Sequence, residues 1–321
     1  MTTLPWIAAA AVVATGMPWL QGATAQPAFG TQEPRTYDEA IIPNFSFEVI
    51  ELNARGSMGV AVLDTQSGKF AGWAERQTFP LNSTFKILLC AAVLERVDAG
   101  SERLDRPIAV SAADLVPHAP IVERRVGGTM TVDELCEAAM TRSDNAAANL
   151  LLETVGGPEG LTARLRAWGD GVTRVDRFET ALNDVAPGDP RDRTTPEAML
   201  GHLRHLLLGD TLSDASHTRL LGWMQSNTTG GARIRAGLPE TWLVGDRTGT
   251  GRGGNSSTVA VMQPPGRAPV LMAVYLEGSA LPANEASGIH AELARIVANN
   301  VQLDAEGFYD TLGPDQRFTW D

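Results

Sequence analysis

The sequence predicts an α/β fold of the α+β kind, in which an antiparallel five-stranded sheet is built from both chain ends, with flanking helices and an inserted all-α domain. Strand patterns occur near both ends of the chain, at residues 58–64, 70–74, 242–246, 258–262 and 270–276. Helical patterns with capping residues and Gly or Pro stops fill most of the chain between about residues 84 and 221. At 321 residues, the chain can bury a large core as one domain or as two closely packed ones.

Residues 1–25 have the pattern of a secretory signal. Residues 4–15 are almost wholly apolar, and Gly22-Ala23-Thr24-Ala25 offers an A-x-A cleavage site before Gln26. The segment contains no Lys or Arg, so only the terminal amine supplies positive charge there. We expect an exported protein with no membrane-spanning segment after cleavage.

The mature part carries the whole formal net charge of −12, because residues 1–25 contain no charged side chain. An acidic surface disfavours nucleic acid and anionic membranes as partners. Residues 26–44 are rich in Gln, Pro, Thr and Gly and predict a disordered leader.

The two cysteines, Cys90 and Cys136, are an even number in an exported chain. A single disulfide and two buried thiols are both compatible with this count. Each cysteine falls in a predicted helical stretch, and we expect the disulfide.

The first elements predicted are a short helix and a hairpin. Residues 45–54 can form an amphipathic helix, and residues 58–64 read as a strand. A turn at Asp64–Lys69 leads to an antiparallel partner strand at residues 70–74.

Helices are predicted next, at residues 83–99, 131–140, 145–155, 160–168, 196–208 and 213–224. Between Arg177 and Arg193 the pattern breaks into a polar loop, and a loop of this length in a compact region is usually functional or disordered.

The last three strands are followed by a final helix at residues 287–298. The domains expected are a sheet domain of residues 45–78 and 238–300, a helical domain of residues 79–237 with the loop 177–193, and a C-terminal tail of residues 301–321.

Ser83 and Lys86 lie one helical turn apart at the start of the apolar run 87–94. They could be an N-cap and a first-turn Lys of an ordinary core helix, or a nucleophile with its base. Only Lys69 and Lys86 among the 26 basic residues are Lys, and Lys69 falls in a turn. Because Arg stays protonated, a buried Lys is the basic side chain that can accept a proton.

Three further short motifs follow Ser83-Thr84-Phe85-Lys86 along the chain. They are Ser143-Asp144-Asn145 between two helices, Glu179-Thr180-Ala181-Leu182-Asn183 in the long loop, and Arg247-Thr248-Gly249 at the end of a strand. In this order, the set resembles class A β-lactamases, whose pattern is S-x-x-K, S-D-N and K-T-G with a loop Glu. The resemblance extends from about residue 45 to 300.

The resemblance implies a two-step reaction on a β-lactam ring. Ser83 would attack the lactam carbonyl, and the backbone N–H groups of Ser83 and Thr250 would hold the oxyanion. Lys86, or Glu179 through a water, would take the proton of Ser83, and the sequence leaves these two open. Ser143 would pass a proton to the leaving nitrogen. Glu179 would then activate the deacylating water.

The resemblance also assigns supporting residues. Asn183 would hold Glu179, and the ion pair of Arg177 with Asp192 would close the loop. Asn145 would bind the substrate amide and Lys86. The substrate carboxylate would be bound by residues of one strand and of the segment Thr229-Gly230-Gly231-Ala232-Arg233, namely Arg247, Thr248, Gly249 and Arg233.

This chain departs from the family pattern at several positions. Arg247 replaces the usual Lys, either as in the carbenicillin-hydrolysing subgroup or through the Arg bias of the composition. Ser256 stands where many relatives have an Arg, and His118 stands where an aromatic usually walls the site. The positions of an extra disulfide typical of carbapenem-hydrolysing members are Asn82 and Gly251 here, which makes that activity less expected. Cys90 and Cys136 match the pair found in many ordinary members.

We therefore expect a periplasmic or secreted bacterial enzyme that hydrolyses penicillin-type antibiotics, as a monomer acting on a small molecule. A cell-wall carboxypeptidase or transpeptidase, and a β-lactam sensor, are the alternatives, and Glu179 is the residue that separates them. We expect no cofactor and no metal. His202 and His205 share a helical face, but with no third ligand nearby they are interpreted as surface or interface residues.

Overall fold

The computed structural model describes residues 44–305, and all statements about the structure refer to these residues. The predicted signal (1–25), nearly all of the leader and the end of the tail lie outside the described residues. No helix within residues 44–305 is long and apolar enough to cross a membrane.

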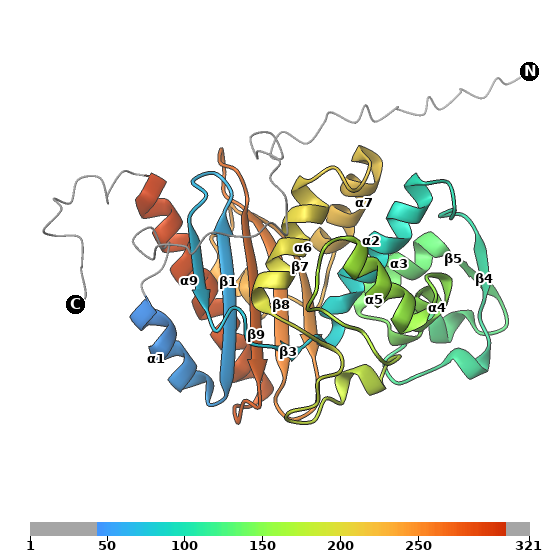
Figure 1. Ribbon diagram of the computed structural model, residues 1–321, viewed down its shortest axis with the longest axis horizontal. Coiled ribbons are helices and arrows are strands. Elements are labelled where there is room, and N and C mark those ends of the chain that lie inside the picture. Colours follow the sequence, from blue (N-terminus) through green and yellow to red (C-terminus); the bar gives the residue numbers. More distant parts are fainter. Residues whose placement is uncertain (1–43, 306–321) are drawn as a thin grey trace, which may run out of the picture.

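One half of the molecule is built around a five-stranded antiparallel sheet with the strand order β2-β1-β9-β8-β7 (Figure 1). Its strands are β1 (Ser57–Asp64), β2 (Phe70–Trp73), β7 (Leu243–Thr250), β8 (Ser256–Gln263) and β9 (Val270–Glu277). β1 and β2 come from the N-terminal part of the chain and the other three strands from its C-terminal part. The pairing of β1 with β9 joins these two parts in one sheet. The predicted fold class is confirmed, whereas the domain boundaries stay a prediction.

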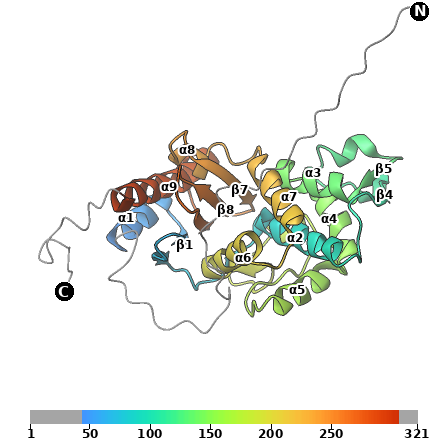
Figure 2. The ribbon, with the colours of Figure 1, turned by 90° about the horizontal axis from the view of Figure 1, so that it is seen from above.

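Alternating side chains of the strands enter two separate apolar clusters. On β9, Met272 and Val274 lie in the cluster that includes α1 (Asn44–Ala54) and α9 (Ala283–Ala305). Ala273 and Tyr275 lie in the cluster on the opposite face of the sheet. A strand places successive side chains on opposite faces, so both faces of this sheet are covered (Figure 2).

The remaining helices lie mainly on the face opposite α1 and α9. α2 has no solvent face along Phe85–Leu94, since every one of these residues is buried. α6 packs against the sheet, while α3, α4, α5 and α7 contact α2. The helices are α2 (Phe85–Asp98), α3 (Val132–Arg142), α4 (Asn145–Thr154), α5 (Gly157–Ala167), α6 (Pro196–Leu208), α7 (Asp214–Gln225) and the short α8 (Ile234–Gly237).

Several short elements were not predicted, because two to four residues carry too little periodicity to be recognised. The short strands form two ladders, β3 (Phe79–Pro80) with β6 (Arg193–Thr194) and β4 (Pro107–Ala109) with β5 (Thr129–Thr131). Single 3-10 turns are formed by η2 (Asn82–Thr84), η3 (Ala112–Asp114), η4 (Val122–Arg125) and η5 (Ala181–Asn183).

Most predicted boundaries differ from the structure by a few residues, and the ends of two elements differ most. β7 continues to Thr250, so Arg247-Thr248-Gly249 lies inside the strand and pairs with β8. α9 extends to Ala305, past the expected end at residue 298.

The predicted disulfide is wrong in this structure, where Cys90 and Cys136 are both free. Cys90 on α2 points its thiol at the backbone carbonyl of Cys136 on α3, 3.9 Å away. Both residues belong to the large apolar cluster, and burial raises the pKa of the Cys136 thiol well above its usual value. The two thiols therefore pack as small apolar side chains.

We expect both thiols to react when the protein is denatured in the absence of reductant. Unfolding removes the burial that keeps the thiols inaccessible. Titration with a thiol reagent in denaturant should give two equivalents per chain. A titre of zero, with two equivalents only after reduction, would show that the exported protein forms the bridge.

Candidate active site

Ser83 lies in the 3-10 turn η2, directly before α2. The residue that precedes α2 is Thr84, whose hydroxyl donates to the carbonyl of Leu81 at 2.6 Å rather than capping the helix. That hydroxyl in turn accepts from the buried Tyr275 on β9 at 3.0 Å. Ser83 is thus not an N-cap, and its turn is fixed to the sheet.

Lys86, fully buried in the first turn of α2, lies at the centre of the site. Its Nζ is 3.1 Å from Ser83 Oγ, 3.0 Å from the carbonyl and 3.3 Å from the hydroxyl of Ser143. It is also 2.6 Å from Asn145 Oδ1 and 3.1 Å from Glu179 Oε1. The predicted residues Ser83, Lys86, Ser143, Asn145 and Glu179 therefore lie together.

These contacts determine which proton of Lys86 can move. The Ser143 carbonyl can only accept, and Asn145 presents its oxygen because its Nδ2 donates to the Pro117 carbonyl at 2.9 Å. These two acceptors take two of the three ammonium protons. The third faces Glu179 and the serine hydroxyls, so a neutral Lys86 could keep its two fixed bonds and turn its lone pair toward Ser83.

The environment makes the neutral form accessible. Burial lowers the pKa of Lys86 to about 8, while the charge of Glu179 raises it and the charge of Arg247 lowers it. Proton acceptors work best when their pKa is close to the working pH. Lys86 therefore has both the position and the proton affinity of a base for Ser83.

Ser143 is the first of the two residues that lie between α3 and α4. It ends α3 in the left-handed conformation, with φ of 58°, and Asp144 caps the start of α4 by accepting from Ala147 N. The buried Asp144 carboxylate also accepts from the backbone of Ile121 and Val122. Asp144 thus holds the junction, while Ser143 and Asn145 on either side of it contact Lys86.

Glu179 reaches the site from the long loop. Its Oε1 accepts from Ser83 Oγ at 3.4 Å, and its Oε2 accepts from Asn183 Nδ2. Asn149 on α4 holds its backbone on both sides, accepting from Glu179 N at 2.8 Å and donating to Glu179 O at 2.9 Å. The Glu179–Thr180 peptide bond is cis.

The neck of the loop is closed by Arg177 and Asp192, as predicted from the resemblance. Arg177 Nε donates to Asp192 Oδ2 at 2.5 Å, and the other carboxylate oxygen accepts the backbone N–H groups of Asp176 and Arg177. The Asp192 carbonyl accepts from Leu81 N at 2.9 Å. Because Leu81 adjoins η2, the loop neck is attached beside Ser83.

Arg247 is fully buried beside Ser143 and donates to its hydroxyl through Nη2 at 2.6 Å. Its Nε and Nη1 have no hydrogen-bond partner among residues 44–305. Burial lowers the pKa of Arg247 to about 10, so the guanidinium is charged at neutral pH. A buried cation with two unused donors suits a ligand carboxylate.

Arg233 provides a second buried cation at the same end of β7. It donates to the carbonyls of Gly249 and Ser257 at 2.8 and 2.7 Å and to Thr250 Oγ1 at 2.7 Å. Gly249 is needed here, because a Cβ would lie 2.4 Å from Ser257 Oγ and 2.9 Å from Ser83 N. β7 can therefore approach η2, the turn that contains Ser83, closely.

Two predicted positions lie at the edge of this cluster. His118 is exposed, has a φ of 64°, and contacts the Arg142 carbonyl through Nε2 at 3.0 Å, while its own carbonyl accepts from Asn145 N. Ser256 contacts the buried His290 at 3.0 Å.

The interpretation of His202 as a surface or interface residue is wrong. His202 is fully buried, and its Nε2 lies 2.7 Å from Asp170 Oδ2. Within the described residues, no group of three or more His, Cys, Asp or Glu side chains is arranged to hold a metal.

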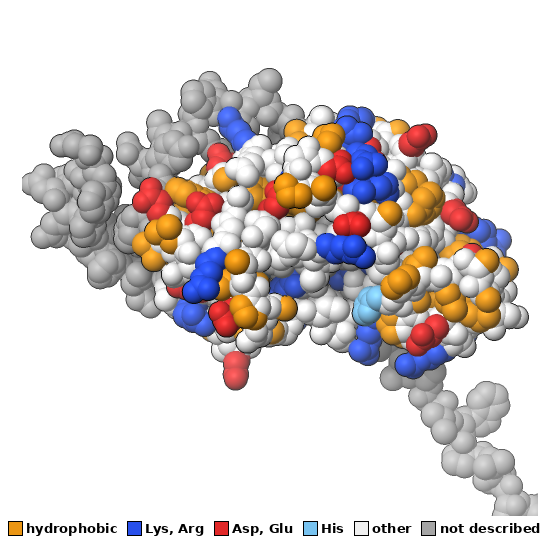
Figure 3. Space-filling model, turned by 90° about the horizontal axis from the view of Figure 1, so that it is seen from below, with side chains coloured by type: hydrophobic (Ala, Val, Ile, Leu, Met, Phe, Trp, Pro, Cys, Tyr) orange, Lys and Arg blue, Asp and Glu red, His pale blue; other side chains and the backbone are white. Residues whose placement is uncertain are grey.

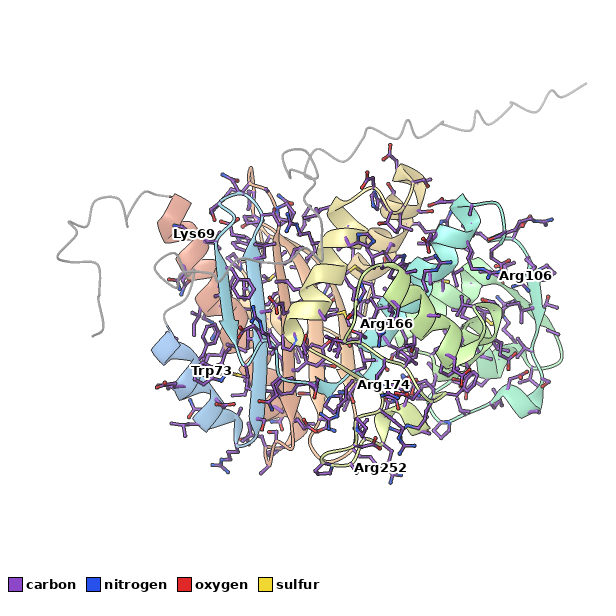
Figure 4. The ribbon with its side chains drawn as sticks, in the orientation of Figure 1. Lys69, Trp73, Arg106, Arg166, Arg174 and Arg252 are labelled. Atoms are coloured by element: carbon purple, nitrogen blue, oxygen red, sulfur yellow. The ribbon has the colours of Figure 1, made fainter. Side chains whose placement is uncertain are left out.

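In Figure 3, basic and acidic side chains are interspersed over the visible face, without a continuous basic band on that face. Lys69 lies at the end of the molecule that the sheet forms, away from α2, whose first turn contains Lys86 (Figures 1 and 4).

Two residues of the site were missed from the sequence. Asn149 lies one helical turn after Asn145 on the same face of α4, and this spacing could have revealed it. Thr229 contacts the Thr248 hydroxyl at 2.5 Å from a Gly-rich segment, and no sequence pattern indicates this contact.

Comparison with known proteins identifies the family. The model of the β-lactamase enzyme family matches residues 47–301. β-Lactamase AST-1 of Nocardia asteroides is 45% identical over 253 residues, which are 79% of this chain and 82% of that protein.

Solved structures agree with this match. An ancestral class A β-lactamase (GNCA) has a TM-score of 0.79 and 54% identity, covering 79% of this chain and 98% of its own. A β-lactamase from Xanthomonas campestris pv. campestris has a TM-score of 0.78 and 47% identity, covering 79% and 96%. The chain therefore belongs to the β-lactamase enzyme family, and its fold is that of the class A enzymes.

Proposed function

We propose that the chain hydrolyses penicillin-type β-lactams through an acyl-enzyme on Ser83, which is released by water that Glu179 activates. Hydrolysis of β-lactams, and with it antibiotic resistance, follows from the family. The assignment of individual residues to steps rests on their geometry.

In the first step, Ser83 Oγ bonds to the lactam carbonyl carbon. Its proton passes to Lys86, or to Glu179 through a water, and the backbone N–H groups of Ser83 and Thr250 stabilise the oxyanion. The ring C–N bond then breaks, and Ser143 gives its proton to the nitrogen while regaining one from Lys86. The contacts of Lys86 with both serine hydroxyls, at 3.1 and 3.3 Å, support this route.

In the second step, a water attacks the ester carbonyl and loses a proton to Glu179. The ester bond breaks, Ser83 regains its proton, and the opened acid leaves. The single observation that carries this proposal is the position of Glu179, a buried carboxylate held by Asn183 and within 3.4 Å of Ser83 Oγ. A carboxylate there can act as base toward an acyl group on Ser83.

The substrate carboxylate is assigned to the end of β7. Arg247 supplies two unused donors, Thr248 a hydroxyl, and Arg233 a second positive charge. Asn145 and His118 would contact the substrate side chain. The Glu179 position also argues against the carboxypeptidase, transpeptidase and sensor alternatives, which lack an efficient base for deacylation.

We further propose that the protein acts as an exported monomer, periplasmic or secreted. The export proposal rests on the sequence of residues 1–25 and on the family. The site is assembled from one chain, which supports action as a monomer.

Replacing Glu179 by Ala should allow penicillin to acylate Ser83 but slow its release on the order of a hundredfold or more, because the base of the second step is removed. Mass spectrometry of the mixture should find a persistent adduct on the variant and none on the parent. Ser83→Ala is the matched control and should give neither adduct nor turnover. Equal turnover by Glu179→Ala and the parent would remove Glu179 from the mechanism.

The pH dependence of acylation should identify the base. If Lys86 is the base, acylation in the parent should rise through about pH 8 as Lys86 loses its proton. Glu179 raises the pKa of Lys86, so in Glu179→Gln the rise should move to lower pH. Stopped-flow acylation rates on both sides of pH 8 test this. No rise near pH 8 in the parent, together with much slower acylation in Glu179→Gln, would assign the base to Glu179 acting through a water.

Arg247→Lys should raise KM for benzylpenicillin about tenfold, since the charge is kept but a charged hydrogen bond to the carboxylate is lost. The exposed Arg252→Lys is the control and should leave KM unchanged. An unchanged KM in Arg247→Lys would show that Arg247 does not bind the substrate carboxylate. Carbenicillin, measured in parallel, tests membership of the carbenicillin-hydrolysing subgroup. If Arg247 is an adaptation to carbenicillin, Arg247→Lys should raise KM more for carbenicillin than for benzylpenicillin.

A further inference from the structure

Arg193 directly follows Asp192 in the chain and makes contacts that the closure of the loop neck does not need. Its side chain is 8% exposed. Nε donates to the carbonyl of Asp189 in the loop, and Nη1 donates to the carbonyl of Thr78 at 3.0 Å. Nη1 and Nη2 bind the carboxylate of Glu277 at 3.0 and 2.6 Å.

These contacts join three parts of the molecule through one guanidinium. Asp189 belongs to the returning arm of the loop, which is the part between Asn183 and Asp192 that leads back to the neck. Thr78 directly precedes β3, and Glu277 is the last residue of β9. A two-oxygen contact between Arg and a carboxylate fixes orientation as well as distance. The returning arm is therefore attached to an inner strand of the sheet and to the segment that leads to Ser83.

The backbone around Arg193 strengthens the same attachment. β6 pairs Arg193 with Pro80 of β3, and the Arg193 carbonyl accepts from Arg174 N at 3.0 Å. By contrast, two neighbouring arginines, Arg174 and Arg191, pair at the surface. Arg174 binds Asp176 and is 45% exposed, and Arg191 binds Asp189 and is 50% exposed.

We infer that Arg193, together with Glu277, is a positioning residue for Glu179. Their contacts are a second attachment of the loop, which holds its returning arm against the sheet. Arg177 and Asp192 close the neck, but they attach the two arms only to each other and, through Asp192 O, to Leu81. Arg193 fixes the closed loop to the sheet on which Ser83 is also anchored. This inference rests on the proposed role of Glu179 in deacylation.

The inference requires a specific kinetic signature in Arg193→Gln. Slower deacylation lowers kcat and KM by the same factor and leaves kcat/KM unchanged, because kcat/KM contains only binding and acylation. We expect both constants for benzylpenicillin to fall on the order of tenfold, with a burst of acylation before the steady state. Glu277→Gln should give the same signature more weakly, since it keeps an acceptor oxygen.

Two further variants keep the test decisive. Arg174→Gln removes an exposed ion pair at the same end of the loop and should behave as the parent (Figure 4). Arg193→Lys keeps the charge but cannot reach all the acceptors from one nitrogen, so its kcat and KM should lie between those of parent and Arg193→Gln. Arg193→Lys and Glu277→Gln carry the test if Arg193→Gln does not fold.

Hydrogen exchange provides a readout that does not depend on turnover. Amides of residues 178–191 should exchange faster in Arg193→Gln, while those of α2 should not change. Parent-like kinetics and exchange in folded Arg193→Gln would overturn the inference. A fall in kcat at unchanged KM would overturn it too, because this pattern means only that less active protein is present. A parent that does not hydrolyse penicillin would instead contradict the proposed function. The exchange comparison would still test whether Arg193 and Glu277 attach the loop to the sheet.

Discussion

The contact between Lys86 and Glu179 sets the conditions that the rest of the site must meet. Both side chains are completely buried, and their charged atoms are 3.1 Å apart. Taking two charges out of water costs several kcal/mol for each ion, and their attraction offsets this only when the remaining donors and acceptors are also satisfied. Asn145 and the Ser143 carbonyl meet this need for Lys86, and Asn183 meets it for Glu179. The polar groups of this site thus act as structural partners before any substrate arrives.

This requirement explains why the site is drawn from distant parts of the chain. The start of α2, the junction of α3 with α4, the long loop and β7 each contribute one or two side chains. No single segment could surround Lys86 with acceptors on several sides. The sheet, built from both chain ends, fixes β7, and Tyr275 on β9 fixes the turn of Ser83 through Thr84. The complete site, with Glu179 beside Ser83 and Lys86, therefore exists only when the fold is complete.

The elements with long periodic patterns could be predicted from the sequence, and so could the motif residues that meet at Lys86. α6 was predicted with its observed bounds, because Thr195 caps it and Pro196 opens it. Contacts between residues far apart in the chain could not be predicted. The pairing of Arg193 with Glu277 and the burial of His202 against Asp170 depend on packing that no local pattern encodes. The disulfide was expected from the cysteine count and the family, yet the two thiols remain unjoined within the apolar cluster.

The absence of a solvent face on α2 along Phe85–Leu94 has a consequence for local unfolding. Segments with few buried contacts open first, and a helix buried on all sides opens only with the whole core. Ser83 and Lys86 are attached to this helix, whereas Glu179 lies on a loop whose arms are partly exposed. Mild heating or denaturant would thus release Glu179, the proposed base for deacylation, while Ser83, the proposed nucleophile, stays in place. A partly opened molecule would capture β-lactams without destroying them, and so behave as a binding protein before it unfolds.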